Sequence, residues 1–191
     1  MEKEPMGKRF LGRLPWLILL FGLGMLVSGV AGLFEEIVAE LSVIVSFQSL
    51  VLGMAGNVGT QSLAVTIRAL SGSGMTAREM RRLVWRESVV GLCNGLVVGG
   101  LSFLIIGAYL HRIRGLSTGF AFSVSLCTGL ALFFSMFLSG VSGSMIPLLC
   151  RRLHIDPAVA SGPFITTLND LVAVVSYYGL SWLLLLRWRG L

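Results

Sequence analysis

An isolated carboxylate and its neighbouring hydroxyls, all on one apolar segment, are the residues of this chain best suited to chemistry. Asp170 is the only charged residue between positions 157 and 186, and Thr166 precedes it by four residues, one helical turn away on the same face. Carboxylate, hydroxyl and carbonyl oxygens are the hard ligands that suit Mg²⁺, Ca²⁺ or Mn²⁺. The candidate metal ligands are Asp170, the backbone carbonyl of Thr166, Thr167 and Asn169.

The surroundings of Asp170 favour a cation site over a structural role. An aspartate in mid-membrane costs about 2.5–3.5 kcal/mol on insertion scales, so it is tolerated where it faces water, protein or a cation. Pro163, next to Gly162, lacks an N–H and leaves the carbonyl four residues back free, which loosens the backbone beside the aspartate. The alternative is an aspartate paired with an arginine or kept protonated in a helix contact. We favour the cation site because no intramembrane cation lies at comparable depth.

A second polar segment lies earlier in the chain and is rich in glycine. Asn57 and Gln61 are spaced by four residues, so both amides point the same way from a helix, and Thr60 flanks them. Glycines at three-residue spacing allow close packing or the exposure of backbone carbonyls to a cavity. The segment either forms hydrogen bonds between packed helices or lines a pore. Because another helix carries an aspartate, we favour the pore lining. The candidate pore-lining residues are Gly56, Asn57, Gly59, Thr60, Gln61, Gly162 and Pro163.

Composition indicates the elements that must position these residues. Hydrophobic residues make up 55% of the 191 and charged residues 13%, whereas a soluble domain carries about 25% charged residues. With a mean hydropathy of +0.87, an integral membrane protein is expected. The net charge of +6 is explained by its location and does not call for nucleic acid. No nucleotide-binding loop, nucleophile elbow or His/Cys cluster is present in the sequence, so we expect no enzyme.

Apolar runs divide the chain into one all-α membrane unit with five transmembrane helices. Each run is near the roughly 20 residues that a helix needs to cross hydrocarbon. Residues 1–13 form a short basic cytoplasmic N-terminus, and residues 14–191 form the five-helix domain. The expected spans are about 14–33, 41–70, 84–110, 116–149 and 158–186.

The distribution of cations predicts an orientation. With the N-terminus in the cytoplasm, eleven of the fifteen Lys and Arg residues lie inside, and the C-terminus lies outside. Glu35 and Glu36 then fall in the first external loop and would form an outer vestibule. In the basic stretch 75–88, Thr76 followed by Glu79 fits a capping box, and we expect a short helix lying along the anionic inner leaflet.

At these residues the chain resembles a known family. The segments GNVGTQSLAVTIRAL (56–70) and DPAVASGPFITTLNDLV (156–172) are similar to the two hallmark segments of the MgtE family of magnesium channels. The resemblance implies an MgtE-type transmembrane domain and a homodimer with its pore on the two-fold axis, lined by the second and fifth helices. It also implies that the pore aspartate is Asp170. Typical members carry cytoplasmic cystathionine-β-synthase-type sensor domains before the channel, whereas here about thirteen residues precede the first span.

The resemblance and the residues together predict a channel for a largely hydrated divalent cation. Mg²⁺ is the implied ion, with Mn²⁺, Ca²⁺ or Co²⁺ as alternatives. A secondary transporter coupled to H⁺ or Na⁺ and a non-conducting structural subunit are the competing functions. The expected location is the inner (plasma) membrane of a bacterium, with the lipid bilayer, a second copy of the chain and an unidentified cytoplasmic regulator as partners.

Overall fold

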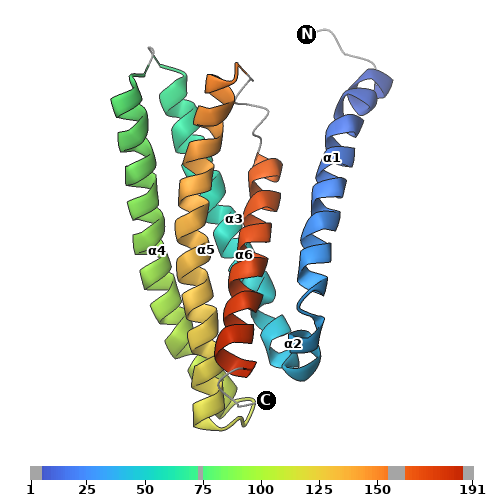
Figure 1. Ribbon diagram of the computed structural model, residues 1–191, viewed down its shortest axis with the longest axis vertical. Coiled ribbons are helices and arrows are strands. Elements are labelled where there is room, and N and C mark those ends of the chain that lie inside the picture. Colours follow the sequence, from blue (N-terminus) through green and yellow to red (C-terminus); the bar gives the residue numbers. More distant parts are fainter. Residues whose placement is uncertain (1–5, 73–74, 155–161, 187–191) are drawn as a thin grey trace.

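The fold is a bundle of long helices that run up and down the molecule (Figure 1). The computed structural model describes residues 6–72, 75–154 and 162–186. Within them, five helices are long and apolar enough to cross a membrane, which confirms the predicted all-α membrane fold. The elements are α1 (Met6–Gly32), α2 (Glu35–Glu40), α3 (Ser42–Leu70), α4 (Ala77–Arg112), α5 (Thr118–Arg152), α6 (Gly162–Ser181) and a π-helical turn, η2 (Trp182–Leu186).

Several element boundaries differ from those expected. Helix α1 begins at Met6 rather than near residue 14, so the described part of the basic start is helical. The expected external loop contains the short helix α2. Helix α6 begins at Gly162, which places Pro163 in a first turn, where a missing N–H is tolerated. The carbonyl that Pro163 was expected to free, four residues back, lies outside the described residues.

The basic stretch before the third span is not a separate helix on the membrane surface. It forms the first turns of α4, which continues without a break to Arg112. The predicted capping box starts this helix: the backbone N–H of Thr76 donates to Oε2 of Glu79 at 2.7 Å, and the Glu79 N–H donates to Oγ1 of Thr76 at 3.3 Å. A helix of 36 residues is about 54 Å long at 1.5 Å per residue, whereas hydrocarbon is about 30 Å thick. The basic turns therefore extend past the apolar span.

Helix α5 lies at the centre of the bundle, in contact with α3, α4 and α6. Glycines allow its closest approaches: a Cβ on Gly99 of α4 would lie 2.6 Å from the carbonyl oxygen of Gly129 on α5, and one on Gly91 would lie 2.8 Å from that of Met136. Even one methyl group could not be added at Gly91 or Gly99 without moving the backbone. The small-residue spacing on α4 therefore brings α4 and α5 into backbone contact.

Two tyrosines of α6 fasten it to the start of α3. The buried hydroxyl of Tyr177 donates to the backbone carbonyl of Ile44 at 2.8 Å, and that of Tyr178 donates to Oε1 of Gln48 at 2.8 Å. Hydrogen bonds of this kind determine which sides of the two helices contact each other. Apolar packing alone would let each helix rotate about its axis. Helix α1, by contrast, stands apart from α3, α4 and α5 and packs along α6 (Figure 1).

Candidate functional site: a cleft between α3 and α6

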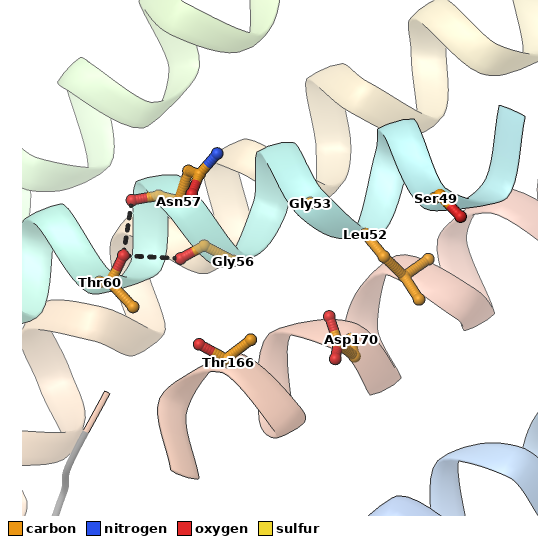
Figure 2. Close-up of a pocket in the computed structure, with 8 residues that line it drawn as sticks. All are labelled: Ser49, Leu52, Gly53, Gly56, Asn57, Thr60, Thr166 and Asp170. Atoms are coloured by element: carbon orange, nitrogen blue, oxygen red, sulfur yellow. Dashed lines mark hydrogen bonds between the residues drawn. The ribbon is translucent and has the colours of Figure 1, made fainter. Parts of the chain in front are cut away.

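A cleft of about 410 Å³ opens between α3 and α6 at the level of Asp170 (Figure 2). The residues of its α3 wall recur at helical spacing, so they lie on one face of the helix. Its α6 wall consists of two residues one turn apart. The lining residues are Ser49, Leu52, Gly53, Gly56, Asn57, Thr60, Thr166 and Asp170.

Among the described residues, Asp170 is the only acid that lines this cleft. Its side chain is half-buried, and the described residues form no hydrogen bond or ion pair with it. It lies about 12 Å along α6 from Gly162 at 1.5 Å per residue, well inside the apolar span Gly162–Leu185. The carboxylate and the Thr166 side chain both lie on the side of α6 that faces α3 (Figure 2). A carboxylate in this setting attracts a cation.

Two hydroxyls of the cleft keep their oxygen lone pairs available. Thr60 donates its proton to the backbone carbonyls of Gly56 and Asn57, each at 3.0 Å, and Thr166 donates to that of Gly162 at 2.9 Å. A hydroxyl whose proton is used in this way can still accept hydrogen bonds, as from water around an ion. Thr166 lies within α6, where its backbone carbonyl is part of the helical hydrogen-bond ladder, and the residue lines the cleft.

Close packing brings the two walls together. A Cβ on Gly56 would lie 3.3 Å from Cγ2 of Thr166, so a side chain at this position would push α6 away from α3. Around Gly53 there is open space instead, with no atom within 4 Å of a Cβ placed there. Glycine therefore has two roles on this face: it sets the helix separation at Gly56 and leaves room at Gly53.

Asn169, expected among the metal ligands, does not line the cleft. It is fully buried and turned toward α5, where its Oδ1 accepts a hydrogen bond from Oγ of Ser142 at 2.7 Å. Gly59, expected in the pore wall, is buried against it: a Cβ on Gly59 would overlap Nδ2 of Asn169. These two residues form a packing junction of α3, α5 and α6. Successive helical residues point about 100° apart, so Asp170 and Asn169 lie on different sides of α6.

Other predicted residues also lie outside the cleft. Gln61 is exposed on α3, and Thr167 donates its hydroxyl proton to the carbonyl of Pro163 at 2.9 Å. Gly162 and Pro163 are in the first turn of α6 without lining the cavity. Helix α2, which contains Glu35 and Glu36, lies at the end of the bundle opposite the start of α6 (Figure 1). The side chain of Glu36 lies outside the described residues.

Three lining residues, Ser49, Leu52 and Gly53, are absent from the predicted pore wall. All three continue the face of Gly56 and Thr60 toward the start of α3, at the i, i+3, i+4 and i+7 positions of one helix side. That spacing was the signal that could have identified them. Leu52 makes the wall partly apolar, whereas the sequence predicted a wall of small and polar residues.

One chain offers a single carboxylate to this cleft. Across the described residues, no group of three or more His, Cys, Asp or Glu side chains could hold a metal ion. A helical membrane protein with one acid in a small-residue cleft is suited to handling a cation through few contacts. It is not suited to a closed protein cage of the kind that binds a resident ion.

Comparison with known proteins identifies this class more closely. Residues 48–180 match the family model for MgtE, described as a divalent cation transporter, so the chain belongs to the MgtE family. This confirms the resemblance seen in the two hallmark segments. The family is one of transporters, in agreement with the expectation of no enzyme.

Three curated relatives have the same name, magnesium transporter MgtE. The protein of Enterococcus faecalis is 40% identical over 169 residues, which cover 88% of this chain and 35% of the relative. That of Bacillus subtilis is 37% identical, covering 88% and 36%, and that of Thermus thermophilus is 33% identical, covering 92% and 37%. The chain thus spans about a third of the length of these relatives.

Proposed function

We propose that the chain forms the ion-conducting part of a Mg²⁺ channel, as a homodimer whose pore is lined by α3 and α6. The observation that carries the proposal is Asp170, a carboxylate near mid-membrane in a cleft with small and polar walls. The names of the relatives supply the ion. Mn²⁺, Ca²⁺ and Co²⁺ are the rivals against which selectivity must be measured.

Charge balance supports two copies around one pore. One Asp170 carries a single negative charge, and the cleft has no second acid. Two copies related by a two-fold axis would place two carboxylates together and match a divalent ion. Without a cation, two facing carboxylates repel each other, so the empty arrangement would draw an ion in.

The ion would pass with most of its water. Mg²⁺ gives up its hydration shell reluctantly and keeps an octahedral set of ligands. Six waters at about 30 Å³ each occupy roughly 180 Å³, which is less than the 410 Å³ of the cleft in one chain. Asp170, Thr166 and Thr60 would then contact the ion through water. Selectivity would come from the fit to a hydrated ion of fixed shape and from its double charge.

The distribution of cations supports the orientation of the pore. The starts of α4 and α6 lie at the same end of the bundle as the start of α1 (Figure 1), and the basic turns of α4 are there. By the positive-inside rule this end faces the cytoplasm and the end with α2 faces outside, in a bacterial inner membrane. Glu35, exposed on α2, would then raise the local cation concentration at the outer mouth.

Flux through purified protein in liposomes tests the proposal. With a Mg²⁺-sensitive dye inside, we expect wild-type influx set by the electrochemical gradient alone, without movement of H⁺ or Na⁺. Asp170→Ala should reduce the influx by at least tenfold, because the ion loses its charged partner. Asp170→Asn should be nearly as harmful, since it keeps the size and removes the charge.

Glu87→Gln is the matched control, because it removes an acid of α4 that does not line the cleft. It should conduct like wild type at equal reconstitution. Coupled H⁺ or Na⁺ movement would identify a secondary transporter, and no wild-type flux would identify a structural subunit. Normal flux in both Asp170 variants would refute the assignment of the pore.

A further inference from the structure

A second and larger cavity lies at the basic end of the bundle, away from the α3–α6 cleft. It measures about 830 Å³ and lies between the first turns of α4 and the last turns of α5, which meet at the same end of the molecule (Figure 1). This volume is in the range of small-molecule binding sites, about 300–1,000 Å³. The ion pathway proposed above makes no use of it.

The walls of this cavity are apolar. Met80 and Val84 of α4 face Leu148 of α5 across it. Met145 and Leu149, which also line it, have 46% and 54% of their surface exposed. The cavity is therefore open along the outside of the α4–α5 pair, where a bilayer would surround the bundle. An apolar chain entering from the bilayer would find hydrophobic contacts on both helices.

The rim of the cavity is cationic. Arg81 of α4 and Arg151 and Arg152 of α5 line it, together with His154, and none of the described residues that line it is acidic. Glu79, the acid of the first turn of α4, is occupied by its hydrogen bonds to Thr76. Within the described residues, these arginines form no ion pair.

Arg151 leaves a hydrogen-bond donor unused. Its Nη1 is buried and has no hydrogen-bond partner in the described part of the chain. A buried donor without a partner costs about 1–3 kcal/mol, more when it is charged. A phosphate oxygen entering the cavity would satisfy this donor with a short, charge-assisted hydrogen bond.

We propose that this cavity binds an anionic phospholipid of the surrounding leaflet. The phosphate headgroup would lie among Arg81, Arg151 and Arg152, and an acyl chain would lie along the apolar walls. Basic pockets between transmembrane helices on the cytoplasmic side recognise such headgroups, and that leaflet is rich in anionic lipid. The proposal rests on the membrane orientation given above, but not on Asp170 or on transport.

Native mass spectrometry of the full chain in detergent tests this site. Dioleoyl phosphatidylglycerol and dioleoyl phosphatidylcholine are titrated separately, so that only the headgroup differs. Wild type should retain the anionic lipid several-fold more than the zwitterionic one. Arg81→Gln/Arg151→Gln should lower retention of phosphatidylglycerol by roughly fivefold for each arginine removed, from about 1 kcal/mol per charge.

Arg68→Gln/Arg82→Gln is the matched control. It removes the same charge from exposed positions of α3 and α4 that do not line the cavity, and it should retain phosphatidylglycerol like wild type. Ala77→Trp, at an exposed lining position, should lower retention without a change of charge, because the indole fills the mouth.

Three outcomes would overturn the proposal. The first is equal retention of the two lipids by wild type, and the second is equal loss in the pocket and control variants. The third is displacement of phosphatidylglycerol by inorganic phosphate, which would assign the site to a free anion. The readout is lipid mass bound to the protein, so its failure is distinguishable from a failure of ion flux.

Discussion

Two adjacent residues of α6 have different structural roles. Asp170 faces the cleft, and Asn169 is buried against α5, because neighbouring side chains on a helix point about 100° apart. The amide holds α6 in a fixed rotation, and that rotation aims the carboxylate at α3. Among the described residues, the buried Nδ2 of Asn169 has no partner, and the hydrogen bond from Ser142 to Oδ1 is the one that its side chain forms. Ser142 is therefore a positioning residue for the acid.

Ser142→Ala tests this role at the scale of one hydrogen bond. The change leaves the buried Oδ1 of Asn169 without its donor, and we expect a loss of roughly 0.5–2 kcal/mol in the free energy of unfolding. Thermal unfolding in detergent measures it. Ser123→Ala is the control, since Ser123 is only half-buried and donates to the carbonyl of Gly119 in its own helix, through a hydrogen bond exposed to the surroundings. Equal melting temperatures for both variants would contradict the role given to Ser142.

At the scale of elements, glycine spacing decides which helices come close. On α4, Gly99 is in contact with the backbone of α5, whereas its neighbour Gly100 has open space around it. The two positions are adjacent glycines of one helix that point in different directions, so that Gly99 is buried and Gly100 is exposed. The length of α4 has a separate consequence: its first turns extend beyond hydrocarbon and carry Arg81 to the cavity described above.

Gly99→Ala and Gly100→Ala form a matched pair for this packing. A methyl at Gly99 would lie 2.6 Å from the carbonyl oxygen of Gly129, so α4 and α5 must separate. We expect a loss of about 1–3 kcal/mol in stability, the usual effect of overpacking. Gly100→Ala should melt at or above the wild-type temperature. A larger loss in Gly100→Ala would show that the helix contact is elsewhere, and thermal unfolding again provides the measurement.

At the scale of the molecule, a single chain presents one wall of the proposed pore. The cleft opens at the surface of the bundle and has one acid, and α1 stands apart from α3 beyond α6 (Figure 1). A second copy facing the cleft would complete the site and supply the second carboxylate. The proposed dimer would in this way match the charge of a divalent ion.

Cross-linking tests where the two copies meet. In a chain with Cys93, Cys127 and Cys150 replaced by alanine, Leu52→Cys places a thiol in the cleft. A short bis-maleimide should then give a covalent dimer of twice 20.6 kDa on a denaturing gel. Leu104→Cys, exposed on α4, is the control and should remain monomeric. A dimer in the control and none in Leu52→Cys would move the interface away from the cleft.

The sequence by itself determined the number of spans, the family and the acid. Apolar runs of sufficient length and a lone Asp170 are local properties, and the hydrocarbon core permits little besides a helix for such runs. Thr76 and Glu79 marked the true start of α4, although the stretch after them was expected to be separate.

The tertiary structure decided which side of each helix matters. Asn169 and Gly59 had the composition of site residues, yet they are buried against each other, while Ser49 and Leu52 line the cleft. Within a helix, each side chain points at a fixed angle to the next. The packing of the neighbouring helices decides which of these side chains face an open space. The cavity among Arg81, Arg151 and Arg152 is of the same kind, because residues 70 positions apart in sequence meet there only once α4 and α5 pack side by side.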